Sequence, residues 1–321
     1  MSYHFFKGGH KSKSDPNSYR GISLLYSISK LFEKAFSSRL PSLRQNFPHQ
    51  TQVAYQKHLC STHASFNMQE VIHHNLERNS NVVLALLDSM KAFDTLWHKA
   101  LFVKLHEYGV RGRAWRLIYE MYQSMRSCVL SNGKLSRWFT IERGVRQGGV
   151  LSATFYLVFI NDLLCEIENS NCGCMLFNLR VFSSVQADDI ALMSTTTTGM
   201  RVLLNICQKY SETWGFKFSA IKSEILKFQS SRPNVSDINL QLYGEIIPVV
   251  TSTKHVGIIL HSGFNSTDRT LNACRTLRGT ALSVLKSGIH PSLLNPLTCA
   301  KIISQTCYPK ALFACELWNE L

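Results

Sequence analysis

The sequence predicts an α+β fold in which helices pack against a sheet whose strands end in carboxylates. One apolar run, Val82–Leu87, is rich in valine and leucine and ends abruptly at Asp88, as is typical of a strand buried on both faces. A second apolar stretch, Val181–Met193, is interrupted by the adjacent pair Asp188 and Asp189, which indicates two strands joined by a tight turn. Apolar residues at helical spacing recur elsewhere along the chain.

The adjacent carboxylates need a stabilising partner. Two like charges side by side repel each other, so a fold that holds Asp188 and Asp189 near apolar strands must raise a pKa or bind a cation. Because Asp88 ends another strand, the two strands could share metal ions. A lone Asp-Asp pair also occurs in ordinary solvated turns, so this interpretation needs independent support.

Two helices are predicted before the first strand. Apolar residues repeat at helical spacing until Pro41 ends the pattern. The apolar positions of this helix are Leu24, Ile28, Leu31, Phe32, Ala35 and Phe36. A second helix is expected over His63–Leu76, with Phe66, Ile72 and Leu76 on its apolar face. The first helix is expected to be scaffold.

Further elements follow the first strand. A helical pattern through Tyr108 can end at Gly109, since glycine favours the left-handed residue that closes a helix. Asn132–Gly133 is the turn signal of a hairpin, whose return strand would run over Trp138–Ile141.

Glycine and threonine residues mark the ends of the later predicted elements. Glycines in Gly144–Gly149 precede a helix with a buried face that reaches Phe159. The threonines Thr195–Thr198 offer caps to another helix, which Gly215 can end. An alternating pattern predicts a strand that begins near Ile225.

Composition favours a folded, basic protein. The chain has 321 residues and is 45% hydrophobic, which allows a substantial core and disfavours disorder. Lys and Arg outnumber Asp and Glu by 35 to 21, a net charge of +14 that suits a polyanionic partner such as nucleic acid. A merely solvated basic surface is the alternative, and charge alone does not decide between them.

The cysteines and the N-terminus bear on the compartment. Ten cysteines are scattered without a Cys-x-x-Cys pair, so neither a zinc site nor a disulfide framework is predicted. The N-terminus has no apolar signal region, and the longest apolar stretch, around Val150–Ile160, is too short to span a bilayer. We therefore expect a soluble, intracellular protein of the nucleus or cytoplasm, with no membrane partner.

The first residues form a basic segment rich in turn formers. Lys7 is followed by two glycines, and Arg20 comes after Gly, Pro and Asn residues. Such a loop can fold over a triphosphate, with lysine as a point charge and arginine as a bidentate fork. The alternative is a solvated basic tail.

Three motifs in order carry a family resemblance. Asp88–Asp94, then Arg146–Ser152, then Ala187–Asp189 resemble successive palm motifs of reverse transcriptases from non-LTR (LINE-type) retrotransposons. The segments Lys7–Gly9 and Tyr19–Leu24 resemble the fingers motif of the same enzymes. Residues 216–228 resemble the fourth palm motif, and residues 254–260 resemble the fifth, a hairpin that grips the primer end.

The resemblance implies a right-hand polymerase fold, with palm and fingers around an antiparallel palm sheet and a partial thumb. Residues 1–80 would be fingers, residues 81–260 palm with interleaved fingers segments, and residues 261–321 the start of a helical thumb. No linker rich in Gly, Ser or Pro divides the chain, so fingers and palm should form one body.

The resemblance also implies RNA-directed DNA polymerisation, with an RNA template, a DNA primer and deoxynucleoside triphosphates as partners. Asp88 and Asp188 would bridge two Mg²⁺ ions, which Mn²⁺ could replace, and Asp189 would assist by its charge. Lys222 would protonate the leaving pyrophosphate, although it could equally be an ordinary surface lysine.

Other residues would bind the nucleotide. Lys7 and Arg20 would contact the incoming nucleotide, and Phe93 would exclude a 2′-hydroxyl by steric clash. Gln147 and Gly148 would let the backbone approach the templating base pair, because glycine has no side chain to block it. Without the resemblance, Phe93 would be an ordinary core aromatic.

The sequence departs from the family pattern at several positions. Gln186 stands where an aromatic residue is usual, Ala153 where proline is common, and Ser219 where asparagine is usual. By the resemblance, the chain would begin within the fingers without an endonuclease domain ahead of it, and it would end soon after the thumb begins. Two alternatives therefore stay open: a truncated, non-catalytic nucleic-acid-binding remnant, and a fragment that never folds stably.

Overall fold

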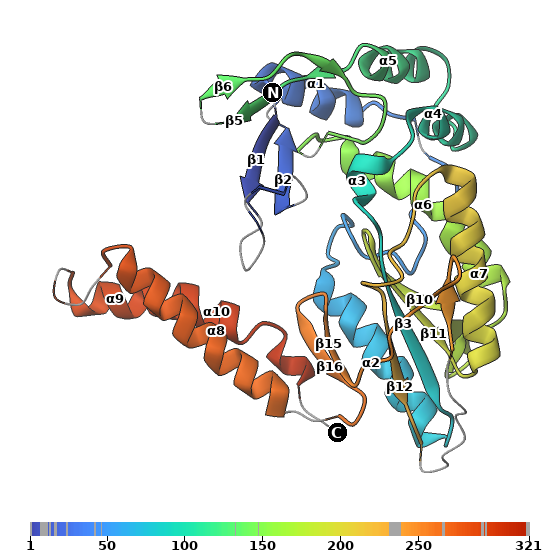
Figure 1. Cartoon of the computed structure of the whole chain (residues 1–321), viewed down its shortest axis with the longest axis vertical. Helices are drawn as coiled ribbons and strands as arrows, with labels where there is room; N and C mark the ends of the chain where they lie inside the picture. The colour runs from blue at the N-terminus through green and yellow to red at the C-terminus, as the bar shows by residue number, and fades with distance from the viewer. Residues whose placement is uncertain are drawn as a thin grey trace.

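Two four-stranded sheets organise the chain, and a helical arm extends from the body (Figure 1). The computed structural model describes residues 2–6, 12, 14–15, 18–23, 25–41, 43–45, 47–131, 133–146, 148–230, 239–264, 267–289, 292 and 294–318. No helix within these ranges is both long and apolar enough to cross a membrane.

The central sheet is antiparallel throughout, in the order β10-β11-β3-β12. Its strands are β10 (Ser183–Gln186), β11 (Asp189–Ser194), β3 (Val82–Asp88) and β12 (Glu224–Phe228). The predicted strands at 82–87 and near Ile225 are therefore confirmed. β3 has a neighbour on each side, which is why every one of its apolar residues is buried.

The two faces of β3 are covered by different helices. Odd-numbered apolar residues of β3 pack with α6 (Ser152–Asn169) and α7 (Thr197–Trp214), while even-numbered ones pack with α2 (Ser61–Glu77). This follows from the alternation of side chains along a strand. The α+β fold class predicted from the sequence is confirmed, with helices on both sides of an antiparallel sheet (Figure 1).

Both edges of the central sheet are covered by short segments. The backbone of residues 51–53 bonds Val185 of β10 in a parallel bridge, with N···O distances of 2.9 and 3.0 Å. On the other edge, Ile225 of β12 forms a parallel bridge with Val249. The strand edges therefore have backbone partners from outside the four strands.

The caps predicted for α7 are confirmed. Thr196 is the N-cap, and its side chain accepts a hydrogen bond from the Gly199 N–H at 3.0 Å. Gly215 ends the helix with φ of 71°, a left-handed conformation that glycine adopts without steric cost.

A fully buried lysine joins α4 (His98–Glu107) to α6. The Lys104 ammonium donates to one oxygen of Asp162 at 2.5 Å and lies 3.9 Å from the centre of the Trp214 ring. The Tyr108 hydroxyl donates to the other Asp162 oxygen, also at 2.5 Å. Burial lowers the pKa of Lys104, and the Asp162 carboxylate opposes that shift. Removing one partner of such a pair typically costs about 3–5 kcal/mol, so it holds the two helices together.

A second sheet, in the order β2-β1-β5-β6, forms the opposite end of the body. Its strands are β1 (Ser2–Phe6), β2 (Tyr19–Ser23), β5 (Val129–Ser131) and β6 (Lys134–Leu135). The predicted hairpin forms, with Gly133 at φ of 75°, but the return strand predicted over Trp138–Ile141 is wrong. Its two-residue loop returns the chain directly into β6, and β7 (Phe139–Thr140) pairs instead with β4 (Arg126–Ser127).

The predicted helices before β3 form, but their buried faces differ from the prediction. In α1 (Ser27–Ser37), Ile28 and Leu31 are 81% and 71% exposed, whereas Glu33 is buried. The reason is that the Glu33 carboxylate accepts backbone hydrogen bonds from a distant loop. In α2, Ile72 is buried as predicted but Phe66 is exposed.

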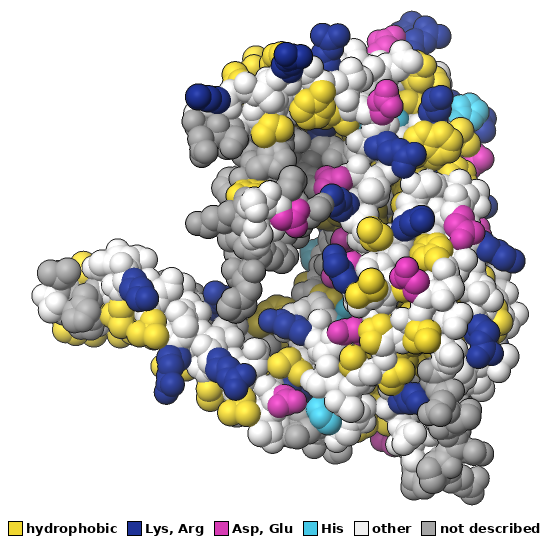
Figure 2. Space-filling model, in the orientation of Figure 1, with side chains coloured by type: hydrophobic (Ala, Val, Ile, Leu, Met, Phe, Trp, Pro, Cys, Tyr) yellow, Lys and Arg dark blue, Asp and Glu magenta, His cyan; other side chains and the backbone are white. Residues whose placement is uncertain are grey.

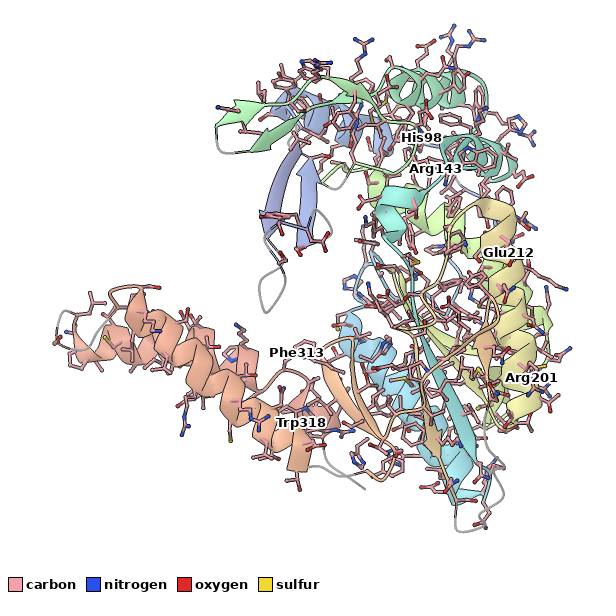
Figure 3. All side chains as sticks on the ribbon, in the orientation of Figure 1. His98, Arg143, Arg201, Glu212, Phe313 and Trp318 are labelled. Atoms are coloured by element: carbon pink, nitrogen blue, oxygen red, sulfur yellow. The ribbon has the colours of Figure 1, made fainter. Side chains whose placement is uncertain are left out.

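A helical arm follows the central sheet. It begins at the hairpin of β15 (Ser252–His255) and β16 (Ile258–His261) and continues as α8 (Thr267–Lys286). The other elements of the described residues are α3 (Ala92–Thr95), α5 (Gly112–Gln123), β8 (Cys174–Leu176), β9 (Leu179–Val181), β13 (Gln241–Leu242), β14 (Glu245–Ile246), α9 (Pro296–Ile302), a π-helical turn (Ile303–Cys307), α10 (Tyr308–Ala311) and a 3₁₀ turn (Cys315–Leu317). The arm packs back on the hairpin, because a Cβ atom added to Gly257 would lie 2.9 Å from the Phe313 ring (Figure 3).

His255, buried in this hairpin, should make stability depend on pH. Burial lowers its pKa from 6.5 to about 4. The unfolded chain therefore binds the extra proton between these pH values, so His255 by itself should lower the free energy of unfolding by about 3 kcal/mol as the pH decreases from 7 to 4; this is the difference expected between the unchanged chain and a variant without the imidazole. Urea unfolding at several pH values measures this.

His255→Gln removes the titrating group and is the control. It should show a shallower dependence of unfolding free energy on pH than the unchanged chain. Equal slopes for the two proteins between pH 6.5 and 4 would contradict the prediction.

Candidate active site

Two strands bring carboxylates together at one end of the central sheet. β3 ends at Asp88 and β11 begins at Asp189, and in the antiparallel register these two residues are direct partners. Residues paired in this way have Cβ atoms about 5 Å apart on the same face. Asp188 comes immediately before Asp189, in the turn from β10. The structure therefore gathers acidic residues that are far apart in the sequence, as the strand pattern predicts.

The turn between β10 and β11 is tight. Gln186 pairs with Asp189, so that only Ala187 and Asp188 lie between the paired positions. Ala187 has φ of 59°, a left-handed conformation that costs a residue with a side chain about 1 kcal/mol. The Ser89 hydroxyl donates to the carbonyl oxygen of Asp188 at 3.4 Å, which links the turn to the end of β3.

The pKa of Asp189 is raised at this end of the sheet. Desolvation first, then the charges of Asp188 and Asp88, raise the pKa of Asp189 to about 6, although the residue is reached by solvent. Burial is the main cause that raises the pKa of the Tyr156 phenol below them, and Asp188 adds to it. A cation bound among these groups would relieve the repulsion.

The donor chemistry of the three aspartates suits Mg²⁺. This ion prefers carboxylate, phosphate and water oxygens, and it needs few protein ligands when a nucleotide supplies phosphates. Within the described ranges, no three His, Cys, Asp or Glu side chains already surround one point as a preformed metal site. The residues fit the ion in ligand type, and binding would require Asp88, Asp188 and Asp189 to turn their oxygens toward it.

The segment before β12 packs on the end of β3. The Asp88 N–H donates to the Ser223 hydroxyl at 3.1 Å, and the Ser219 N–H donates to the Asp88 carbonyl at 2.9 Å. Lys222 Nζ lies 3.7 Å from Asp88 Oδ2, and both side chains are substantially exposed. An exposed ion pair of this kind adds little stability. It does place the predicted proton donor beside a predicted metal ligand.

Phe93 lies on the aromatic floor of the site. It belongs to α3, and its half-buried ring stacks on Tyr156 with centroids 4.7 Å apart and 24° between the ring planes. Tyr156 also interacts with Ser89 and with the charge of Asp188. Phe93 is thus a core aromatic by packing, and it is also a neighbour of the acidic turn.

Glu33 accepts hydrogen bonds from the end of the loop that precedes α6, residues 144–151, which we call the glycine loop. This role of Glu33 was not predicted from the sequence. Its Oε2 accepts from the Val150 N–H at 2.7 Å and the Leu151 N–H at 3.4 Å, just before α6 begins. A carboxylate is favourable there because the first N–H groups of a helix have no intrahelical partner. Arg146, the first residue of the second motif, lies 3.6 Å from the same carboxylate. The available signal was a single acidic residue between the apolar positions of α1.

The predicted nucleotide-binding residues are only partly described. Gly148 has φ of 109°, and a Cβ atom there would lie 3.3 Å from the carbonyl oxygen of Ser23, at the end of β2. The glycine loop therefore approaches the strand that carries Arg20. The side chain of Arg20, and Lys7 and Gln147 altogether, lie outside the described residues.

The segment before α2 also reaches the acidic turn. Burial and then the charge of Asp188 raise the pKa of Tyr55, whose side chain is nonetheless 61% exposed. Tyr55 could not be predicted from the sequence, because an isolated tyrosine in a segment without periodicity gives no signal.

The residues that depart from the family pattern lie close to the site. Gln186 ends β10, and its Oε1 is buried with no hydrogen-bond partner among the described residues. Ala153 is half-buried in the first turn of α6. Ser219 bonds the end of β3 through its backbone, so its side chain is not needed for that contact.

The chain is similar in sequence to polymerases of mobile elements. The chain is 25% identical over 266 residues to the RNA-directed DNA polymerase from mobile element jockey of Drosophila funebris, covering 78% of this chain and 27% of that protein. It is 22% identical over 321 residues to the probable RNA-directed DNA polymerase from transposon X-element of Drosophila melanogaster, covering 96% and 34%. The chain thus spans well under half the length of these relatives. Among solved structures, telomerase from Candida tropicalis in complex with a telomeric RNA fragment aligns with a TM-score of 0.48 and 10% identity, covering 91% of this chain and 46% of that one.

A family model decides the assignment. The model described as reverse transcriptase (RNA-dependent DNA polymerase) matches residues 10–260, which is most of the chain and includes all three predicted palm motifs. This protein therefore belongs to the reverse transcriptase family, and its named relatives come from non-LTR mobile elements.

Proposed function

We propose that this chain is the RNA-directed DNA polymerase domain of a non-LTR retrotransposon protein, and that it extends a DNA primer with deoxynucleotides on an RNA template. The observation that carries the proposal is the pairing of Asp88 with Asp189 across β3 and β11, with Asp188 in the adjoining turn. Acidic residues from two strands at one end of a sheet are what metal-assisted phosphoryl transfer needs.

The three aspartates would hold the metal ions of the reaction. When bound, two Mg²⁺ or Mn²⁺ ions would stabilise the charge that develops on the attacking and leaving oxygens. Asp88 and Asp188 would be the bridging ligands, and Asp189 would add charge from the paired strand. The raised pKa of Asp189 fits this role, because burial first, and then the charges of Asp188 and Asp88, disfavour its ionised form without a cation.

Other side chains would bind the incoming nucleotide or donate a proton to its leaving group. Lys222, beside Asp88 and 72% exposed, would carry a proton to the leaving pyrophosphate. Phe93 would lie beneath the sugar. Lys7, Arg20 and Gln147 remain predicted contacts to the nucleotide and template.

We also assign the polymerase regions from this arrangement. Residues 1–80 would be fingers, 81–260 palm with interleaved fingers segments, and 261–321 the start of the thumb. Lys and Arg side chains are spread over the body and along the arm in Figure 2, which fits a nucleic-acid partner for a chain with net charge +14.

Asp188→Asn should stop primer extension, because it removes a ligand carboxylate with almost no change in side-chain size. The rate of single-nucleotide addition should fall by at least about 10³-fold, or about 4 kcal/mol of barrier. The measurement is extension of a DNA primer on an RNA template with Mg²⁺. Glu245→Gln, at an exposed carboxylate in β14, is the control that should keep the rate.

Two results would defeat the catalytic assignment. One is equal extension by Asp188→Asn and the unchanged chain. The other is tight, salt-sensitive binding of a primer–template duplex by the unchanged chain without any extension, which would select a non-catalytic nucleic-acid-binding remnant.

Phe93→Ala should weaken discrimination against ribonucleotides. Removing the ring makes room for a 2′-hydroxyl, so the ratio of kcat/KM for a deoxynucleotide to that for the matching ribonucleotide should drop about tenfold or more. If the ring only supports Tyr156, both kcat/KM values should fall together and the ratio should stay constant.

A further inference from the structure

Gln52 is a buried polar residue that contacts the acidic turn directly. It is 1% exposed, and its side-chain oxygen accepts from the Ala187 N–H at 2.9 Å and from the Ala54 N–H at 3.0 Å. Its side-chain nitrogen donates to the Ala187 carbonyl at 3.3 Å. One amide therefore bonds both backbone groups of the residue that precedes Asp188.

These bonds matter because Ala187 is the strained residue of the turn. Its φ of 59° is unfavourable for a residue with a Cβ atom, so the conformation persists only where the surroundings stabilise it. Gln52 is the described side chain that supplies bonds to both its N–H and its carbonyl. The direction in which Asp188 leaves the turn depends on this conformation.

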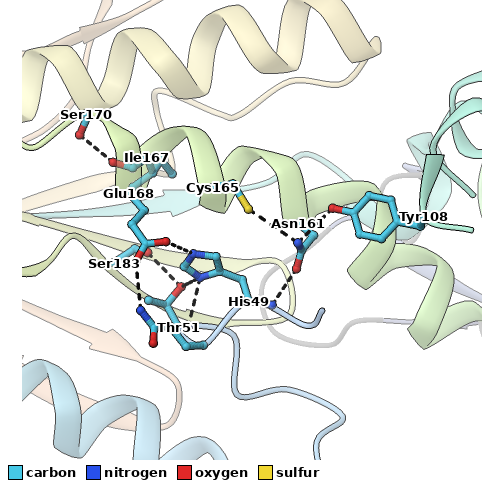
Figure 4. Close-up of polar contacts among 10 residues, drawn as sticks. His49, Thr51, Tyr108, Asn161, Cys165, Ile167, Glu168, Ser170 and Ser183 are labelled. Carbon is cyan, nitrogen blue, oxygen red and sulfur yellow. Dashed lines mark hydrogen bonds and ion pairs between the residues drawn. The ribbon is translucent and has the colours of Figure 1, made fainter. Parts of the chain in front are cut away.

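The segment that carries Gln52 is itself fixed to α6. The His49 N–H donates to the side-chain oxygen of Asn161 at 2.7 Å, and His49 Nε2 lies 2.9 Å from Glu168 Oε2 (Figure 4). The Asn161 amide in turn donates to the Tyr108 hydroxyl at 3.0 Å, which joins it to the buried ion pair beneath. The segment that carries Gln52 thus links α6 to the acidic turn.

We propose that Gln52 is a positioning residue for the carboxylates: by bonding both backbone groups of Ala187, it sets the place of Asp188 relative to Asp88, and so the affinity of the site for divalent ions. This inference rests on the proposed function for its kinetic consequence. Its binding consequence can be measured without any catalysis. A purely structural role would instead lower stability and leave ion binding and kinetics unchanged.

Gln52→Met tests the proposal, because methionine has nearly the same length and volume but cannot make these hydrogen bonds. Loss of a residue that orients metal ligands typically costs about 10–100-fold in metal affinity or activity. We expect Mn²⁺ binding, followed by the electron paramagnetic resonance of free Mn²⁺, to weaken about tenfold or more. We also expect the Mg²⁺ concentration for half-maximal extension to rise by a similar factor.

Gln208→Met is a matched control. The Gln208 side chain accepts from the Tyr243 N–H at 2.8 Å, and Tyr243 has φ of 54° in the turn between β13 and β14. This control therefore also removes a glutamine bond to a left-handed turn residue, but in the hairpin of β13 and β14, which contains none of the three aspartates. It should lower the melting temperature and leave Mn²⁺ affinity and the Mg²⁺ dependence as they are.

The outcomes separate this inference from the proposed function. Weaker Mn²⁺ binding by folded Gln52→Met supports positioning even if the unchanged chain extends no primer, in which case the polymerase proposal alone fails. Unchanged Mn²⁺ binding, or an equal loss in Gln208→Met, overturns the positioning role. If Gln52→Met does not fold, Gln52→Asn decides, since its amide is one methylene too short to reach both groups of Ala187. Unaltered Mn²⁺ affinity of Gln52→Asn would likewise overturn the positioning role.

Discussion

The antiparallel register of β3 and β11 determines where the acidic residues lie and which helices cover each face of the sheet. It places Asp88 opposite Asp189 and lets the alternate residues of β3 enter two separate cores. A shift of one residue would turn every side chain of β3 to the other face, so the packing of α2 on one side and α6 and α7 on the other fixes the register. Apolar contacts along the whole of β3 therefore determine where the acidic residues lie. The free energy of this packing offsets the repulsion between their charges.

Helix α6 connects the scaffold to the site at several levels. Its first turn follows the loop whose N–H groups donate hydrogen bonds to Glu33, and its second turn carries Tyr156, whose pKa responds to the charges of the aspartates. Its later turns carry Asp162, which bonds the buried Lys104, and Glu168, which bonds His49. Such buried polar groups are costly when unpaired and rigid when fully bonded. One helix thus relates the glycine loop, the aromatic floor and the segment beside the acidic turn.

Local patterns in the sequence predicted those features that neighbouring residues determine. The strand ending at Asp88, the turn before Asp189 and the caps of α7 follow from runs, spacing and capping residues that a short window contains. The hairpin turn at Gly133 was predicted correctly for the same reason. Its return strand was predicted at the wrong residues, because β7 pairs with β4, which lies outside the hairpin.

The errors and omissions have a common physical cause. Glu33 bonds a backbone group 117 positions away, and Gln52 bonds one 135 positions away. Hydropathy treats both as surface residues, since it cannot see a buried N–H that needs an acceptor. The sequence could therefore supply the acidic residues and the family, but not the polar contacts that hold loop and turn in place.

The covered edges of the central sheet have a consequence for how copies of the chain meet. An open edge strand offers unpaired N–H and carbonyl groups to any extended segment, and is a common starting point for aggregation and strand exchange. Here residues 51–53 occupy the outer side of β10, and Val249 occupies the outer side of β12. A second molecule would have to displace these segments before it could pair with Val185 or Ile225, so the extension of the sheet by another copy of the chain is hindered at these two positions.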